Sequence, residues 1–341
     1  MHLKSNSKVK YYDEEGMGLV AEESCDVKLP RRVDSDPETE EKNRASFWSL
    51  VINFGLLIVK VILSYVTGSL SFLASAVDSF LDLISQSIIF CAVRGNRDVD
   101  ERVYPVGRGR LEPLSIVIVA AVMGMASLQV VLESFYRIIH GFESEGKIKV
   151  PTISTAAILM LITTIGLKVL LYLMCKKLAK NSDSMNALAE DHKNDILSNL
   201  VALLAAWLAS RHKILWFLDP VGAIGISIFI VLNWLEMAKE QTDKLVGRTA
   251  DRHFIRKIEK LAEKHDLRLK VDIVRAYYFG HRYLVEIEIV MKEDTTLRIA
   301  HDVALSLQQK VEELDEVERC HVHVDYDFRT EREHKATYLT S

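Results

Sequence analysis

Four aspartates occur as two pairs inside long apolar stretches of the chain. Asp78 and Asp82 lie in one stretch, and Asp191 and Asp195 lie in another. The spacing within each pair is i, i+4, so on a helix both carboxylates of a pair project from one face. An uncompensated carboxylate at the centre of a membrane costs at least about 2.5 kcal/mol. We therefore expect a cation to lie between the two pairs.

The composition separates an apolar central region from charged flanks. Of the 341 residues, 49% are hydrophobic and 26% are charged, but charge is scarce between about Phe47 and Leu235. Apolar runs of about 20 residues are typical of transmembrane helices. The net charge of −4 favours neither nucleic acid nor an anionic surface as a partner. The four cysteines are scattered without a C-x-x-C pair, which predicts inert thiols. We expect an integral membrane protein in a lipid bilayer.

The apolar runs predict six transmembrane helices. The first two form a hairpin across Thr67-Gly68-Ser69, and the third begins near Pro113, because proline suits the first turn of a helix. The fifth must include the acidic motif, since its wholly apolar part, 200–209, is too short to cross a bilayer. The expected spans cover about residues 47–66, 70–93, 113–139, 152–175, 184–209 and 214–235.

The charge distribution divides the chain into four parts. Residues 1–43 are expected to form a disordered cytosolic tail, and residues 44–238 form the six-helix transmembrane domain. Residues 239–328 form a cytosolic domain, and residues 329–341 form a flexible tail. Six spans place both termini on one side, and the basic residues near the tails and in the second and fourth loops identify that side as cytosolic.

Residue counts place the two acidic pairs at similar depths in the membrane. Asp82 and Asp191 lie 12 and 11 residues from the basic flanks of their spans, and Asp78 and Asp195 lie 16 and 15 residues from them. At 1.5 Å per residue these separations are about 16 to 24 Å along the helices. We therefore expect one four-oxygen site.

The region from about Asp251 to Phe328 has the pattern of a small α+β domain. Apolar residues recur at helical spacing after Phe254 and again between Ala300 and Leu314. The expected strands, with alternating apolar and polar residues, cover about residues 270–278, 285–291 and 317–327. The order αββαβ predicts a ferredoxin-like domain of the split-βαβ kind. The expected fold is thus a polytopic α-helical membrane protein with this domain at its C-terminal end.

Carboxylates on two helices suit a divalent cation. An all-oxygen set favours a hard ion such as Mn²⁺ over Zn²⁺, which usually takes nitrogen and sulfur ligands. Protonated or paired structural acids are the alternative, and Lys193 is the only nearby basic partner that we identify. His192 projects roughly 100° away from Asp191 around the helix, so we expect a neighbour, proton acceptor or packing residue and not a ligand. Asn194 and Asn199 are candidates for further oxygen donors.

These motifs resemble those of the cation diffusion facilitators, specifically the manganese-type subgroup. Within that subgroup the chain is similar to the plant metal tolerance proteins. The resemblance covers about residues 47–328. Zinc members carry His at the first position of the fifth-span motif, where this chain has Asp191, and many have a His-rich loop that is absent here. The sequences that carry the resemblance are Asp78-Ser-Phe-Leu-Asp82, Tyr104-Pro-Val-Gly-Arg-Gly-Arg-Leu-Glu-Pro113, Asp191-His-Lys-Asn-Asp195 and Asp219-Pro-Val-Gly222.

The resemblance implies a homodimeric secondary transporter, not an enzyme, that moves metal out of the cytosol in exchange for protons. Asp78, Asp82, Asp191 and Asp195 would bind the metal, and the same carboxylates would carry protons. No cofactor is implied beyond the transported cation, expected to be Mn²⁺. We expect an endomembrane location, Golgi, vacuolar or endosomal, in preference to the plasma membrane, with both termini in the cytosol.

The resemblance also implies that the cytosolic domain holds the dimer together and can bind regulatory metal. His321, His323, Asp325 and Asp327 share one face of the last strand at a period of two. His323-x-Asp325 matches a metal-binding strand of zinc members, so these two residues are candidates for a cytosolic metal site. The match fails at other positions where zinc members carry His, and a solvated polar face is therefore the preferred interpretation.

Other functions remain open at this point. A Zn²⁺, Fe²⁺ or Co²⁺ exporter of the same family could use an oxygen site, since the usual affinity order works against Mn²⁺. An intramembrane aspartyl protease also needs two membrane aspartates, but its Gly-x-Gly-Asp motif is absent here and two acids would be unexplained. A passive cation channel would follow the metal gradient and voltage regardless of protons. A metal sensor would bind metal without moving it.

Overall fold

A computed structural model describes most of the chain. The described residues are 37–67, 70–95, 102–104, 106–143, 155–211 and 217–328. Most of the expected N-terminal tail, the expected flexible tail 329–341 and the Gly68-Ser69 part of the first hairpin turn lie outside these described residues.

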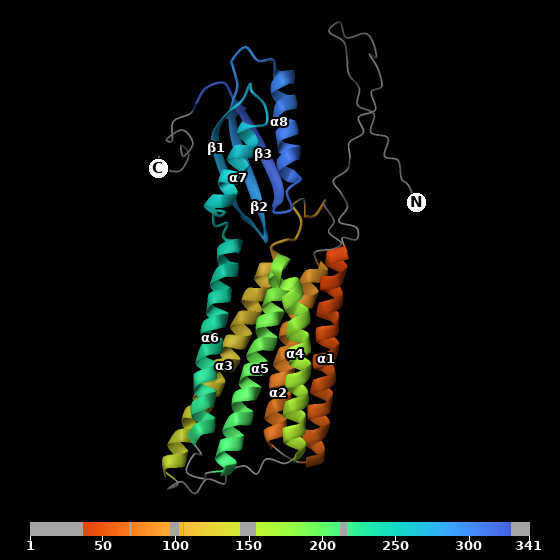
Figure 1. Cartoon of the computed structure of the whole chain (residues 1–341), viewed down its shortest axis with the longest axis vertical. Coiled ribbons are helices and arrows are strands. Elements are labelled where there is room, and N and C mark those ends of the chain that lie inside the picture. Colours follow the sequence, from red (N-terminus) through yellow and green to blue (C-terminus); the bar gives the residue numbers. More distant parts are fainter. Residues whose placement is uncertain are drawn as a thin grey trace, which may run out of the picture. The chain divides into compact units, whose positions relative to one another are not determined.

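Six long helices run side by side in the apolar part of the described chain (Figure 1). A short 3₁₀ helix, η1 (Ala179–Asn181), separates the fourth from the fifth. The six helices are α1 (Pro37–Thr67), α2 (Leu70–Gly95), α3 (Leu111–Glu143), α4 (Thr155–Leu178), α5 (Asp183–Arg211) and α6 (Leu218–Leu245). This arrangement confirms the predicted polytopic helical fold.

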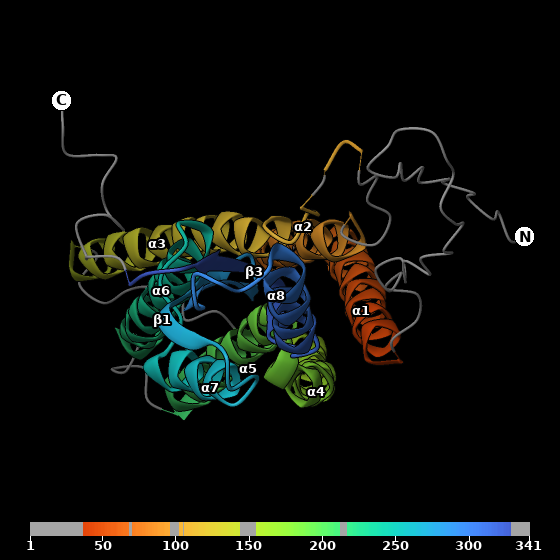
Figure 2. The same cartoon turned by 90° about the horizontal axis from the view of Figure 1, so that it is seen from above.

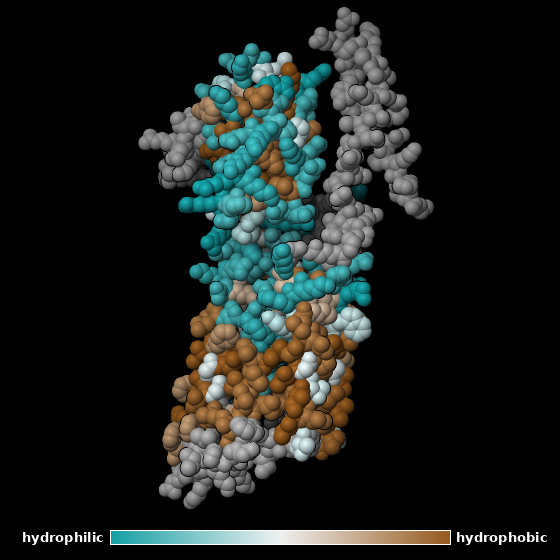
Figure 3. All heavy atoms as spheres, viewed as in Figure 1, coloured by the Kyte–Doolittle hydropathy of each residue, from teal (hydrophilic) through white to brown (hydrophobic). Residues whose placement is uncertain are grey.

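Five of the six long helices, all except α5, are long and apolar enough to cross a membrane. Helix α5 carries the acidic motif, but its 29 residues extend about 43 Å, more than the hydrocarbon core of a bilayer. The motif therefore lies inside a helix, as predicted. Figure 3 shows apolar surface over the helical bundle and hydrophilic surface over the C-terminal domain. The chain is a membrane protein.

The ends of two helices differ from the boundaries expected from the sequence. Helix α1 begins at Pro37, so residues 37–43, which we expected to belong to the tail, are helical. Proline suits a first turn, and polar residues extend a helix as readily as apolar ones. Helix α6 continues to Leu245, past the domain boundary expected after residue 238. At both places the helix therefore extends beyond its apolar segment into polar sequence.

The C-terminal region forms the predicted αββαβ domain. Its elements are α7 (Arg252–Glu263), β1 (Lys270–Phe279), β2 (Arg282–Val290), α8 (Leu297–Glu312) and β3 (Val317–Asp325). The sheet order is β1-β2-β3, with β1 antiparallel and β3 parallel to β2. The parallel pair is joined through α8, as a crossover connection requires.

One face of the sheet forms the core of this domain. Val285, Ile287 and Ile289 of β2 are fully buried and alternate with more exposed glutamates. They pack with Ile258 of α7 and Leu307 of α8 in one apolar cluster. Figure 2 shows α7 and α8 beside the sheet. The period of two in the sequence thus reflects a sheet covered by helices on one face only.

The tip of the β1–β2 hairpin lies against the segment that leads into α3. Gly280 at this tip has φ +69°, and a Cβ atom there would lie 2.6 Å from the carbonyl oxygen of Gly109. The guanidinium carbon of Arg110 lies 4.2 Å from the centre of the Phe279 ring. The close approach of the two backbones therefore requires glycine in the hairpin.

Glu112, in the first turn of α3, connects this hairpin to α5. Its Oε1 accepts a hydrogen bond of 3.0 Å from the backbone N–H of Ser184, and its Oε2 lies 3.9 Å from Nδ1 of His281. The first N–H groups of a helix lack partners within that helix, and a negative charge there suits the helix dipole. Glu112 therefore fixes the start of the helix that carries the acidic motif.

Replacement of Gly280 by alanine should weaken this contact. The positive φ and the approach to Gly109 predict a loss of about 1 to 3 kcal/mol. We expect a lower midpoint of thermal unfolding, measured by intrinsic fluorescence in detergent. His281→Ala is the matched control, because it removes a contact without straining the backbone. An unchanged midpoint for Gly280→Ala would contradict the described approach.

The buried thiol of Cys320 should be unreactive in the folded domain. Burial, and secondarily the Glu312 carboxylate, raise the pKa of this thiol to about 12. At pH 8 only about one thiol in ten thousand is then ionised, and the thiolate is the reactive form. We expect alkylation by iodoacetamide, followed by mass spectrometry of the Cys320 peptide, to be more than about 100-fold faster after unfolding in urea. Equal rates with and without urea would contradict this burial.

Candidate metal site

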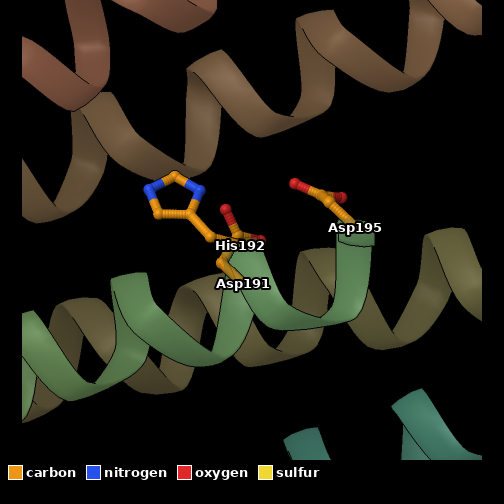
Figure 4. Close-up of side chains that lie close together, drawn as sticks. All are labelled: Asp191, His192 and Asp195. Carbon is orange, nitrogen blue, oxygen red and sulfur yellow. The ribbon is translucent and has the colours of Figure 1, made fainter. Parts of the chain in front are cut away.

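The acidic motif of α5 forms a compact group with the histidine between its aspartates. Asp191, His192 and Asp195 each offer a ligand atom within 4.8 Å of the others (Figure 4). Asp191 and His192 are buried, and Asp195 is partly buried. Among the described residues this is the only group of three or more His, Cys, Asp or Glu side chains with that geometry.

The position of His192 differs from the sequence expectation. A helical step of roughly 100° separates it from Asp191, yet its ring lies on the same side of α5 as the two carboxylates (Figure 4). The side chain is long enough to compensate for the angular step. His192 is therefore a candidate ligand, together with Asp191 and Asp195.

A lysine on α4 joins the acids of α2 and α5. The ammonium of Lys168 lies 3.0 Å from Oδ2 of Asp82 and also pairs with Oδ2 of Asp195. The lysine side chain is 3% exposed. A tethered ammonium thus supplies the cation that we expected between the two acidic pairs.

Lys168 was not predicted from the sequence. Lys193 was the nearby basic residue identified there, but Lys193 pairs with Glu190 instead. The available signal was a single lysine in the middle of the otherwise apolar run of α4. By the reasoning already applied to buried aspartates, an isolated charge in such a run predicts an oppositely charged partner.

The two acidic helices align one turn away from the predicted register. Asp82 lies opposite Asp195, and Gln86, one turn further along α2, donates a weak hydrogen bond of 3.5 Å to Oδ2 of Asp191. Counting from Lys180 produced the error, because that residue belongs to η1 and not to α5. From the helix ends, Asp82 precedes Gly95 by 13 residues and Asp195 follows Asp183 by 12, which matches the observed pairing.

Asp78 lies outside the group formed by the other three aspartates. It is one turn from Asp82 on α2 and is exposed, whereas Asp82 is 7% exposed. Near it, the buried Lys60 of α1 donates hydrogen bonds of 2.6 Å to Oγ of Ser79 and 3.3 Å to the carbonyl of Ser75. These contacts supply the polar partners of Lys60, which the sequence did not identify.

A hydrogen-bonded chain orients the His192 ring. The Ser49 hydroxyl donates to Oε1 of Gln86 over 3.2 Å, and the oxygen of this hydroxyl lies 2.9 Å from Nε2 of His192. A hydroxyl has one proton, so Nε2 must donate to Ser49. Asn53 also donates to Oε1 of Gln86, over 2.8 Å, which fixes the orientation of that amide. With the Ser49 proton directed at Gln86, a neutral His192 ring carries its lone pair on Nδ1.

Several buried polar atoms around Asp191 have no hydrogen-bond partner among the described residues. They are Oδ1 of Asp191, Nδ1 of His192, and both side-chain polar atoms of Asn194. Buried polar atoms are nearly always partnered in folded proteins, so such a group indicates a site for another polar species. Asn199, by contrast, donates its amide N–H to the Asp195 carbonyl over 2.7 Å.

The cytosolic candidates lie on the uncovered face of the sheet. His323 of β3 is exposed and lies beside Glu288 of β2, whose carboxylate accepts a hydrogen bond of 3.2 Å from Arg275. In the described part of the chain, no third metal-ligating side chain joins His323 and Asp325 in an ion-sized group. A cytosolic metal site at His323 and Asp325 therefore stays a prediction.

Comparison with known proteins covers both parts of the chain. A family model of the cation efflux transmembrane domain matches residues 46–246, and a model of the cation efflux protein cytoplasmic domain matches residues 250–327. Metal tolerance protein 7 of Oryza sativa subsp. japonica is 35% identical over an alignment of 318 residues that covers 89% of this chain and 78% of that protein.

Two further relatives agree with these matches. Metal tolerance protein 3 of Oryza sativa subsp. japonica is 33% identical over 97% of this chain and 82% of its own length. Metal tolerance protein 11 of Arabidopsis thaliana is 34% identical over 85% of this chain and 72% of its own length. Together with the matched domains and the buried acidic group, these similarities show that the chain belongs to the cation efflux family, the cation diffusion facilitators, whose members are metal transporters and not enzymes.

Proposed function

We propose that this protein is an Mn²⁺/H⁺ antiporter that removes Mn²⁺ from the cytosol. The observation that carries the proposal is the buried group of carboxylates contributed by α2 and α5, with an imidazole nitrogen beside them. Three ionised carboxylates at membrane depth are costly unless cations compensate them, and Lys168 supplies only one positive charge. Transport of a divalent cation gives these acids a function that a structural role does not.

The donor set supports Mn²⁺ but includes more than oxygen. Asp82, Asp191 and Asp195 offer carboxylate oxygens, which suit a hard divalent ion. Nδ1 of His192 adds a nitrogen donor, which Zn²⁺, Fe²⁺ and Co²⁺ also accept. The preference for Mn²⁺ therefore rests on the majority of oxygens and on Asp191 at the motif position where zinc members carry His. Export of another divalent ion is the alternative within the family.

Asp78 completes the proposed transport path. It lies one turn from Asp82 and further from the predicted cytosolic end of α2. An ion that leaves Asp82, Asp191 and Asp195 for the opposite side of the membrane would meet its carboxylate next. We therefore retain all four aspartates as ligands, with Asp78 serving a later stage of the transport cycle.

Proton exchange follows from the same carboxylates. A carboxylate binds metal in its ionised form, so release of the metal favours proton uptake, and the site can carry protons on its return. An alternating-access rearrangement would expose this one site to each side in turn. A passive channel lacks this exchange and would show no dependence on a pH gradient.

The matched cytoplasmic domain supports a homodimer. The family model that matches residues 250–327 is named as a dimerisation domain. The sheet of this domain leaves one polar face uncovered by α7 and α8. We propose that two copies associate through this domain in the cytosol, with both termini on that side. We further propose an endomembrane location, because the protein would then store the exported metal within the cell.

Asp191→Ala should abolish Mn²⁺ transport. The protein is reconstituted in liposomes with a pH gradient, and Mn²⁺ uptake is followed with a metal-sensitive dye. Loss of a ligand at the centre of the buried group is expected to reduce the rate by at least about 100-fold. Asp302→Ala, which replaces an exposed carboxylate on α8 of the cytosolic domain, is the control.

Two results of this assay would contradict the proposal. Retained uptake by Asp191→Ala would show that the acidic group does not bind the substrate. Uptake by the wild-type protein that is independent of the pH gradient would favour a channel. Competing Zn²⁺, Fe²⁺ and Co²⁺ in the same assay test the choice of metal.

Ser49→Ala should weaken Mn²⁺ binding although Ser49 offers no ligand to the ion in this arrangement. Its hydroxyl accepts the Nε2 proton of His192 and so presents Nδ1 to the carboxylates. Loss of such an orienting partner typically costs about tenfold in metal affinity. Equilibrium binding by calorimetry measures the effect. Ser87→Ala is the matched control, since the Ser87 hydroxyl bonds its own helix, at the Leu83 carbonyl. Equal affinities of the two variants would contradict the orienting role of Ser49.

A further inference from the structure

We propose that Lys168 is a built-in competitor of the transported cation. Its ammonium lies 3.0 Å from Oδ2 of Asp82 and pairs with Oδ2 of Asp195, two oxygens that belong to different helices. A divalent ion shared by these two carboxylates would occupy the same place. The inference rests on the proposed function, because it assigns the ammonium and the ion to one site.

The charges of the site explain why the competition matters. Asp82, Asp191 and Asp195 carry three negative charges when they are ionised, and Lys168 brings the group one positive charge. When the ammonium is absent, buried carboxylates face one another without compensation, which is strongly unfavourable. A divalent ion would then supply the compensation that Lys168 no longer provides. Removal of the lysine charge should therefore tighten metal binding.

The surroundings of Lys168 couple its displacement to helix movement. Thr164, Leu171 and Cys175 lie on the same face of α4 as Lys168, and all four residues are buried. This face packs against α5, which carries Asp191 and Asp195. The ammonium therefore cannot leave the carboxylates for water by rotating its side chain alone. Entry of the ion requires α4 and α5 to shift relative to each other, and return of the ammonium helps to expel the ion.

This role differs from that of a purely structural ion pair in a measurable way. A lysine that only holds the helices together would, on removal, loosen the site and weaken both metal binding and transport. A competing lysine, on removal, strengthens binding while it slows release. Affinity and transport rate then change in opposite directions.

The test compares neutral and charged replacements in the full-length protein. Lys168→Gln removes the charge, and Lys168→Arg keeps it. Lys244→Gln is the matched control, because Lys244 is also a buried lysine in an ion pair but bonds Asp183 and Glu240 instead of the carboxylates of the site. Mn²⁺ binding is measured by calorimetry in detergent, and Mn²⁺ uptake is measured in liposomes.

We expect Lys168→Gln to bind Mn²⁺ at least about tenfold more tightly than the wild type, which is about 1.4 kcal/mol, and to transport it at least about tenfold more slowly. Lys168→Arg and Lys244→Gln should stay within about threefold of the wild-type affinity. Should Lys168→Gln not yield folded protein, Lys168→Met, which also lacks the charge, replaces it in the comparison. Equal or weaker Mn²⁺ binding by the neutral variant would overturn the proposal.

Asp195→Asn separates this inference from the function on which it rests. Loss of Mn²⁺ binding in this variant supports the site, whatever the Lys168 variants show. If Asp195→Asn loses binding and Lys168→Gln binds no more tightly than the wild type, only the competing role of Lys168 fails. If Asp195→Asn binds Mn²⁺ like the wild type, the proposed transport site itself is wrong.

Discussion

The buried contact between Lys168 and the carboxylates of Asp82 and Asp195 is the interaction on which the arrangement of the helices depends. It joins α2, α4 and α5 at one place, where each charge would be costly without the others. The same requirement for compensation makes the place suitable for a transported cation. The stability of the bundle and the binding of the substrate thus depend on the same carboxylates.

Two further sets of contacts fix the position of this ion-paired group. Within the bundle, the chain of Ser49, Gln86 and His192 links α1, α2 and α5 through buried hydrogen bonds. At the other end of the motif helix, Glu112 satisfies an N–H group at the start of α5 and lies near His281 in the cytosolic hairpin. The position of α5 is therefore tied both to the donor set and to the cytosolic domain.

Much of the fold follows from the sequence because hydrophobic periodicity determines it. Five long apolar runs, the shorter apolar segment after the acidic motif, and the alternation of Val285, Ile287 and Ile289 with glutamates were sufficient to predict the bundle and the αββαβ domain. The site was predicted less completely. Its aspartates were visible as charges in apolar runs, but the register between α2 and α5 depends on the 3₁₀ turn at Lys180, which has no clear sequence signal. The orientation of His192 depends on Ser49, 143 residues away.

The most direct test of the central claim is a cryo-electron microscopy map of the full-length protein in lipid with Mn²⁺ bound. We predict density for one ion per chain between Asp82, Asp191 and Asp195, with Nδ1 of His192 directed at the ion and the Lys168 ammonium withdrawn from both carboxylates. A map in which Lys168 still bridges Asp82 and Asp195 while Mn²⁺ lies elsewhere would contradict both the site and its competing lysine.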